Sequence, residues 1–222
     1  MPDLPVVGRS FIFGPMNNDT RPNHDHNDAT GAFHPAMRDW QRFYGTTGTV
    51  TTCFFNNGAG LGAARVQQQI LDAMYAGDSG SAGYDAICYF GHGTKQGLET
   101  CGWYADSIAS FTDAVDRLGA VDCKVVLYAC SCAEPGGIAY RISENLRGWW
   151  SYGLKVYGHS LPGHSTRNPT VRVYPSGGGE VGFTLAPPRK IPQWIHAIRD
   201  DLRSTLWARF PFMTQEQIEA EL

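Results

Sequence analysis

The sequence predicts an α/β fold, a mainly parallel sheet of about six strands with helices on both faces. Short apolar runs, typical of strands buried on both sides of a sheet, alternate along the chain with helical patterns. The chain has 222 residues, which is enough to bury a sizeable core. Charged residues make up 18% of it, so the composition indicates a folded chain rather than a disordered one.

The predicted elements follow one another in a regular order. The first strand is expected at 8–14, and a polar loop rich in Asn, Asp and His follows at 17–31. Further strands are expected at 49–56, 84–90, 124–129 and 154–158. Helices are expected near 34–44, at 62–76 with a stripe at Val66, Ile70 and Met74, and around two later stripes formed by Ile108, Phe111, Val115 and Leu118 and by Ile138, Ile142 and Leu146. Strands and helices that alternate in this way form βαβ units.

The order changes after the fifth predicted strand. VRVYP and EVGFTLA flank the turn SGGG at 176–179 and predict a hairpin or an added edge strand. An amphipathic helix is expected next, with apolar positions at Ile195, Ile198, Leu202, Leu206 and Phe210, and a last helix from Thr214, where T-x-x-Q fits a capping box. We therefore expect one α/β domain at 1–188 and a helical extension at 189–222 that packs on it.

Charge and cysteine content argue against several classes of protein. The net charge of −3 gives no electrostatic footprint for nucleic acid or for an anionic membrane, and no apolar segment is long enough to span a bilayer. The first residues lack the basic and apolar regions of a secretory signal. Six cysteines in a chain of this length do not resemble a disulfide framework. We expect free thiols and a cytoplasmic location.

Two chemically useful side chains follow neighbouring strands of the predicted sheet. The third strand ends in FGHG, which carries His92, and the fourth ends in YACSC, which carries Cys130. If these strands are neighbours, a thiol and an imidazole emerge side by side at the carboxyl edge, where ligands bind in open parallel sheets. The thiol can attack a substrate and the imidazole can move the proton. Gly93 lets the backbone approach a substrate, and its N–H could stabilise an oxyanion.

This ordered pair of motifs resembles the catalytic pair of the caspase-like cysteine peptidases, which include caspases, metacaspases, legumain and CHAT-type domains. YFGHG matches the His-Gly half and VVLYAC the Ala-Cys half, over roughly residues 8–170. The resemblance implies the caspase-haemoglobinase-like fold, a His92/Cys130 dyad that cleaves peptide bonds without a cofactor, and an oxyanion hole from the N–H groups of Gly93 and Cys130. The expected partner is a peptide or protein substrate.

A later segment, SLPGHSTRNP at 160–169, resembles the stretch with which caspases hold an acidic substrate residue. By that resemblance Arg167 would recognise an aspartate before the scissile bond, and Arg21 is a possible second basic contact. Arginine suits this role because its planar guanidinium binds a carboxylate through two hydrogen bonds. Tyr128 stands where caspases place Gln, and many relatives cut after Arg or Lys. An acidic pocket built on Glu134 or Asp106 therefore remains an alternative.

Other interpretations of the same residues remain open. Cys132 is interpreted as a bystander: by strand alternation it points the same way as Cys130, but the strand is ending there. A redox pair with Cys130 stays a minor alternative, because C-x-C is not the C-x-x-C spacing of thioredoxin-like sites. The cysteines also lack the paired spacing of a structural zinc site. A catalytically silent binding or scaffold module is a further alternative. His159 and His164 flank the end of the fifth strand and are equally compatible with a cleft and with an ordinary loop.

Two more motifs suggest ligands that we do not expect. PNHDHNDAT at 22–30 begins like a calcium loop but lacks its glycine and its final glutamate, so a solvated loop and no bound metal are expected. GAGLGA at 58–63 formally matches a dinucleotide fingerprint through Gly58, Gly60 and Ala63. It follows the second strand rather than the first, and Asp78 falls in a loop. We interpret it as a tight turn, with a dinucleotide-binding enzyme as the alternative.

Overall fold

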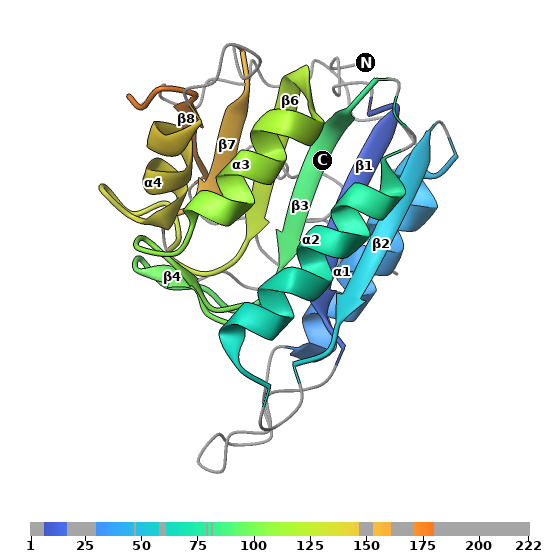
Figure 1. Ribbon diagram of the computed structural model, residues 1–222, viewed down its shortest axis with the longest axis horizontal. Coiled ribbons are helices and arrows are strands. Elements are labelled where there is room, and N and C mark those ends of the chain that lie inside the picture. The colour runs from blue at the N-terminus through green and yellow to red at the C-terminus, as the bar shows by residue number, and fades with distance from the viewer. Residues whose placement is uncertain are drawn as a thin grey trace, which may run out of the picture.

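Six strands form one sheet in the computed structural model of the protein, in the order β2-β1-β3-β6-β7-β8 (Figure 1). Five of them run parallel, and β8 pairs antiparallel with β7 at one edge. The strands are β1 (Arg9–Pro15), β2 (Thr49–Phe55), β3 (Tyr84–Phe90), β6 (Gly119–Tyr128), β7 (Lys155–His159) and β8 (Val171–Pro175). The structure describes residues 7–16, 30–46, 48–57, 61–78, 80, 82–146, 153–160 and 171–179.

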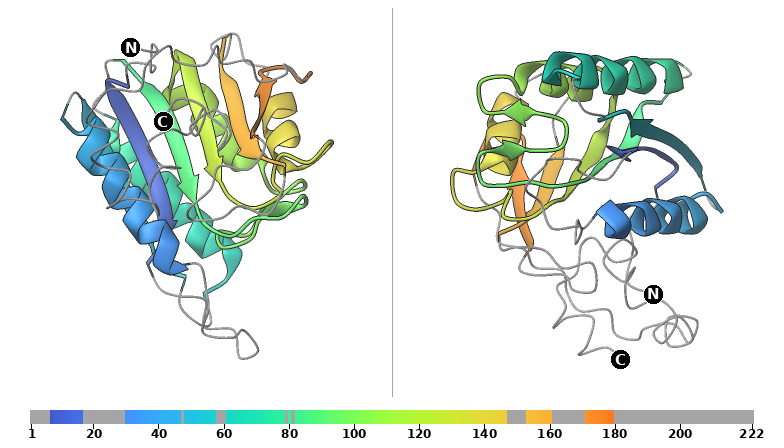
Figure 2. Two further views of the ribbon diagram at one scale, coloured as in Figure 1. Left: turned by 180° about the vertical axis from the view of Figure 1, so that it is seen from behind. Right: turned by 90° about the horizontal axis from the view of Figure 1, so that it is seen from below.

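Helices cover both faces of this sheet, as the view along it in Figure 2 shows. Helix α1 (Thr30–Tyr44) lies on one face, and α2 (Ala63–Gly77), α3 (Ala109–Leu118) and α4 (Ile138–Asn145) lie on the other. The coarse prediction of an α/β fold with a mainly parallel sheet of six strands is therefore confirmed. None of the helices in the described part of the chain combines the length and apolar character needed to cross a bilayer.

Two apolar clusters hold the layers together, one on each side of the sheet. Phe13 of β1 lies in the cluster under α2 and α3, where its ring centroid is 5.3 Å from that of Tyr89 and 5.9 Å from that of Phe111. On the α1 side the rings of Phe90 and Tyr128 stack with centroids 4.3 Å apart. Because side chains alternate between the faces of a strand, β3 and β6 each contribute to both clusters.

Most of the predicted elements lie close to their expected positions. The stripes predicted for the helices at 62–76, near 108–118 and near 138–146 are buried throughout. The strand predicted at VRVYP is β8, an edge strand. Helix α1 begins at Thr30, within the predicted polar loop, and β6 begins at Gly119, directly after α3. EVGFTLA and the predicted C-terminal helices at 189–222 lie outside the described residues.

One element was not predicted from the sequence. Residues 97–104, GLETCGWY, contain a short antiparallel hairpin formed by β4 (Gly97–Leu98) and β5 (Trp103–Tyr104). Strands of two residues are too short to show an alternating pattern, so periodicity could not reveal them. Leu98, Cys101 and Trp103 are buried, and they pack in the cluster beneath α2 and α3. The hairpin is therefore fixed to the core beside the end of β3.

The strand order determines where a ligand site can form. From β1 the chain crosses to β2 on one side, and it then returns to β3 on the other side of β1. In open parallel sheets, ligands bind outside the carboxyl ends of the strands, near the place where the order reverses. This place lies between β1 and β3, and β6 is the next strand along the sheet. The candidate histidine and cysteine follow β3 and β6.

All six cysteines are free thiols, as expected, and five of them are buried. The pKa of a thiol rises when burial removes water from its charged form. Burial raises the pKa of Cys53 to about 11 and the pKa values of Cys123 and Cys132 to about 12. The pKa of Cys88 is also raised well above its ordinary value, mainly by burial. Because burial disfavours the charged thiolate, ionisation of these cysteines at high pH favours the unfolded chain.

We expect the free energy of unfolding to fall steeply above pH 9. Below the ordinary thiol pKa of 9.0 both states are protonated, whereas at higher pH the unfolded chain ionises and the folded chain does not until about pH 12. Ionisation of Cys123 and of Cys132 in the unfolded chain should each lower the free energy of unfolding by about 1 kcal/mol at pH 10. Denaturant unfolding at pH 8, 9 and 10 measures this loss. The variant Cys123→Ala should show a shallower decline, and a decline identical to that of the wild type would contradict the assignment.

Candidate active site

His92 and Cys130 emerge from neighbouring parallel strands at the same level of the sheet. Phe90 of β3 lies opposite Tyr128 of β6 in the ladder, and Gly91 extends the pairing by donating its N–H to the Tyr128 carbonyl at 3.3 Å. Each candidate residue stands two positions beyond that last opposed pair. The condition set by the sequence, that the third and fourth βαβ strands be neighbours, is therefore confirmed.

The two loops that carry these residues also touch each other. A Cβ atom added at Gly93 would lie 2.7 Å from the Cβ of Ala129 and 3.4 Å from the carbonyl oxygen of Cys130. A separation of 2.7 Å is shorter than two non-bonded carbon atoms can reach. The loop after β3 can therefore approach the loop after β6 only because residue 93 is glycine. The backbone of Gly93 is therefore held directly against the segment that carries the thiol.

Hydrogen bonds fix the backbone of His92 on both sides of the residue. Its N–H donates to Oγ1 of Thr100 at 2.9 Å. Its carbonyl accepts from the Tyr89 hydroxyl at 2.8 Å and from the N–H of Glu99 at 3.0 Å. Its ring lies nearly perpendicular to that of Phe33 in α1, with ring centroids 5.2 Å apart. The imidazole is therefore placed by the β4–β5 hairpin on one side and by α1 on the other.

Glu99 fastens the hairpin to the histidine loop. Its two carboxylate oxygens accept hydrogen bonds from the Thr94 hydroxyl at 2.7 Å and from the Tyr104 hydroxyl at 2.9 Å. The N–H of Thr94 donates in turn to the carbonyl of Gly97 at 3.0 Å. Sequence reasoning had assigned no role to these polar residues.

The turn after Cys130 has an unusual backbone. Ser131 has a φ of 50°, the only positive φ of a non-glycine residue among the residues described. A serine in this left-handed region costs free energy, and such strained residues gather at functional sites. Cys130 itself is half-buried, which makes it the only one of the six cysteines that is not buried. The turn thus holds the most accessible thiol of the chain at the end of β6.

The same turn separates Cys132 from Cys130. Strand alternation predicted that both would point the same way, but β6 ends at Tyr128 and Ser131 redirects the chain. Cys132 is fully buried, and its Sγ lies 3.4 Å from the carbonyl of Ala129 and 3.9 Å from that of His159. It belongs to the cluster beneath α2 and α3, whereas Tyr128 belongs to the cluster under α1. The thiol of Cys132 serves packing, and this burial argues against a redox pair.

The loop that follows is tied to the last two strands of the sheet. The N–H of Ala133 donates to the carbonyl of His159 at 2.9 Å, and the hydroxyl of Tyr174 in β8 donates to the carbonyl of Ala133, also at 2.9 Å. His159 is buried, at 2% exposure, so it fits neither the cleft nor the ordinary loop that the sequence allowed. These contacts leave the Cys130 loop with little freedom to move away from β7.

We expect one fast-reacting thiol in the folded protein. Cys130 is half-buried, whereas the other five cysteines are buried and the pKa of each is raised by burial. Titration with a small alkylating reagent near neutral pH should modify Cys130 first and should modify all six in concentrated guanidinium chloride. Cys53, at 8% exposure, is expected second and much more slowly. If peptide mapping finds Cys132 modified as fast as Cys130, the burial of Cys132 and the greater accessibility of Cys130 would be contradicted.

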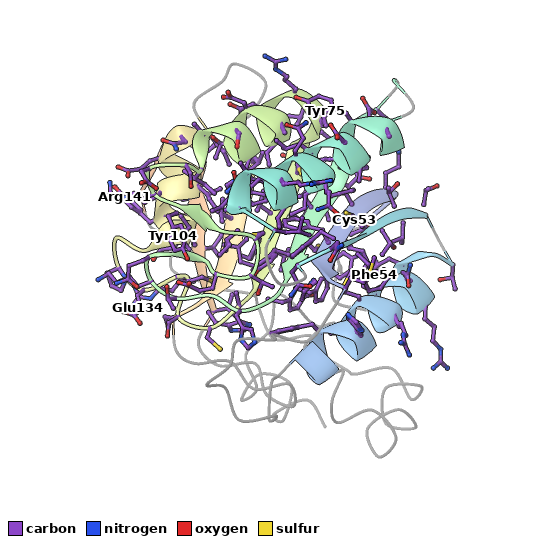
Figure 3. The ribbon with its side chains drawn as sticks, turned by 60° about the horizontal axis from the view of Figure 1, so that its bottom comes forward. Cys53, Phe54, Tyr75, Tyr104, Glu134 and Arg141 are labelled. Carbon is purple, nitrogen blue, oxygen red and sulfur yellow. The ribbon has the colours of Figure 1, made fainter. Side chains whose placement is uncertain are left out.

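A pocket of about 350 Å³ opens beside the dyad loops, between the β4–β5 hairpin and the start of α4. Asp106, one of the two acidic residues considered for a basic substrate, lines it together with Lys95 and Arg141. Figure 3 shows Tyr104, Glu134 and Arg141 on the same side of the molecule. The two cations offset the charge of Asp106, so this pocket does not have the acidic character that a lysine or arginine side chain would need.

Several predicted site residues receive no test from the structure. Arg167, Arg21 and His164 lie outside the described residues, as does the polar loop at 22–29. Within the described part of the chain, no group of three or more His, Cys, Asp or Glu residues could hold a metal ion.

The position of Asp78 argues against a dinucleotide site at the motif 58–63, because such a site needs an acidic residue near the bound ribose. Gly58 and Gly60 lie outside the described residues, and Ala63, the last residue of the motif, begins α2 after the carboxyl end of β2. Asp78 follows the far end of α2, where it pairs with Arg9 at 3.5 Å and Arg9 begins β1. A parallel strand begins at the opposite edge of the sheet from the one where it ends, so Asp78 and Ala63 lie at opposite edges. Asp78 therefore cannot bind a ribose held at the start of α2.

A scan against models of known protein families and a search of curated protein sequences found no match for this chain.

Proposed function

We propose that the protein is a cysteine endopeptidase in which Cys130 is the nucleophile and His92 moves the proton. One observation carries this proposal: two residues of the right chemistry follow adjacent parallel strands at the same level, beside the switch point of the sheet. The strained turn at Ser131 and the hydrogen-bonded backbone of His92 support it further, because both hold the pair in place.

The reaction would proceed in two halves. The Cys130 thiol gives its proton to His92, and the sulfur attacks the peptide carbonyl, whose π electrons move to the oxygen. When the oxyanion collapses, the C–N bond breaks and the leaving amine takes the proton from His92, which leaves a thioester. Water then gives a proton to His92 and attacks the thioester carbonyl. Collapse of this second intermediate releases the carboxylic acid, and the proton returns to the Cys130 sulfur.

The backbone N–H groups of Gly93 and Cys130 are the proposed donors to the oxyanion. Donors fixed before the reaction stabilise developing charge without further reorganisation. The contact of Gly93 with Ala129 and with the Cys130 carbonyl supports this role, because it sets the spacing of the two segments. For the residue before the scissile bond we propose an acidic side chain recognised by Arg167, with Arg21 as a second contact, as the family resemblance implies.

Labelling with peptidyl electrophiles tests the proposal directly. The reagents should differ only in the residue before the warhead, as Asp, Asn, Arg, Lys and Leu, and intact mass should be measured on wild type, Cys130→Ala and Cys132→Ala. We expect one adduct that requires Cys130 and not Cys132, with the highest rate for the Asp reagent. A highest rate for Arg or Lys would reverse the proposed specificity. No adduct, or equal labelling of several cysteines, would contradict the nucleophile and favour a silent binding module.

A further inference from the structure

The pocket beside the dyad combines apolar walls with charged ends. Its walls include Tyr104 and Ile138, and Lys95, Asp106 and Arg141 supply its charges. The Tyr104 hydroxyl donates to Glu99, which fixes that ring through the same carboxylate that holds the histidine loop. The volume of about 350 Å³ is enough for an amino-acid side chain with part of its backbone.

Both loops of the proposed dyad continue into this pocket. Lys95 stands three residues after His92, so their Cα atoms are at most about 11 Å apart. Gly136 and Ile138 follow the turn after Cys130, and the N–H of Ile138 donates to the carbonyl of Lys95 at 2.8 Å. This hydrogen bond joins the two loops at residues that line the pocket. A substrate held at the dyad can therefore reach the pocket within two or three residues.

Among the side chains that line the pocket, cations outnumber carboxylates by one. Lys95 and Arg141 carry two positive charges, and Asp106 carries one negative charge. Arg141 also pairs through one guanidinium nitrogen with Glu144 at 2.9 Å, and a guanidinium has five N–H donors in all. An extended side chain with an apolar stem and a carboxylate end matches the walls and the cations together. Glutamate has this shape.

We propose that this pocket is a subsite for an acidic side chain, glutamate above all, on the leaving-group side of the scissile bond. The inference rests on the proposed peptidase function. We place the subsite on the leaving-group side for two reasons. In the proposed mechanism His92 donates its proton to the leaving amine, and Lys95, on the loop that carries His92, lines the pocket. Specificity would then be determined on both sides of the scissile bond, and not only by the residue before it.

Matched peptides test the subsite. Internally quenched peptides would carry the residue that the electrophiles select before the scissile bond, and Glu, Gln or Lys at the first, second or third position after it. At one of these positions we expect kcat/KM for Glu to exceed that for Gln by about fivefold. Lys95→Gln and Arg141→Gln should reduce this ratio toward one, and Asp106→Asn should increase it. Lys155→Gln, at the start of β7, is the matched control and should leave the ratio unchanged.

Two different failures can be told apart. The electrophiles carry no residue on the leaving-group side, so their reaction with Cys130 reports the dyad without the pocket. Normal labelling of Cys130, together with equal rates for Glu and Gln or with a preference for Lys, would overturn the subsite alone. A Glu preference that survives in the double variant Lys95→Gln/Arg141→Gln would overturn it as well. Absence of both labelling and cleavage would overturn the peptidase function, and the subsite with it.

Discussion

The variant Cys130→Ala is expected to lose peptide hydrolysis by a factor of about 10⁴ or more, while its unfolding temperature stays close to that of the wild type. The thiol is half-buried at the end of β6 and fills no core space, so its removal leaves the packing intact. His92→Ala should cost nearly as much, because thiol and imidazole act as one unit in the proposed mechanism. The double variant should be no slower than the slower single variant.

Steady-state hydrolysis and thermal unfolding of the three variants measure both parts of this prediction. Cys132→Ala is the matched control, since it removes a thiol two residues away that is buried in the core. It should lose stability and retain most of its kcat/KM. Multiplicative losses in the double variant would indicate that His92 and Cys130 act independently. Activity that survives in Cys130→Ala would exclude this residue as the nucleophile.

The variant Gly93→Ala is expected to lower kcat/KM by about 100-fold without unfolding the protein. Its new methyl group would lie 2.7 Å from the Cβ of Ala129, and neither side chain has a rotatable bond that could relieve the contact. The histidine loop must therefore shift by several tenths of an ångström away from β6. A shift of this size misplaces both His92 and the proposed oxyanion donor of residue 93.

A second glycine and a second substitution make this test specific. Gly62→Ala adds a Cβ with nothing within 4 Å just before α2, and it should leave kcat/KM unchanged. The double variant Gly93→Ala/Ala129→Gly removes the methyl group of Ala129 that the new methyl group would clash with. Its kcat/KM should be about tenfold higher than that of Gly93→Ala. Wild-type activity in Gly93→Ala would show that the spacing of the two loops does not matter for the reaction.

The layers of the fold could be predicted because local patterns determine them. The stripe Val66, Ile70 and Met74 predicted both α2 and its buried face, and the run at 84–90 predicted β3 with its bounds. The sequence pattern left open whether β3 and β6 would be neighbours. No periodicity contains this information, because strand order depends on contacts between segments far apart in the sequence.

The details of the site could not be predicted for the same reason. Nothing in Ala-Cys-Ser-Cys reveals that Ser131 is left-handed, so alternation along β6 could not show that Cys132 packs in the cluster beneath α2 and α3. The role of Glu99 depends on a hairpin whose strands are too short for a periodic signal. The sequence could not show that Asp106 shares its pocket with a cation, because Arg141 comes 35 positions later in the chain and joins it only through the fold.

The strand order also has a consequence for synthesis of the chain on the ribosome. Strand β1 lies between β2 and β3, and Ser10 pairs with Ala86, which is 76 residues later. At about 5 to 20 residues per second, the second edge of β1 stays open for about 4 to 15 s after that strand has been made. Its apolar run at 11–13, Phe-Ile-Phe, is exposed during this interval. The nascent chain is therefore most prone to aggregate before β3 has emerged, and a chaperone that binds short apolar segments would act on β1.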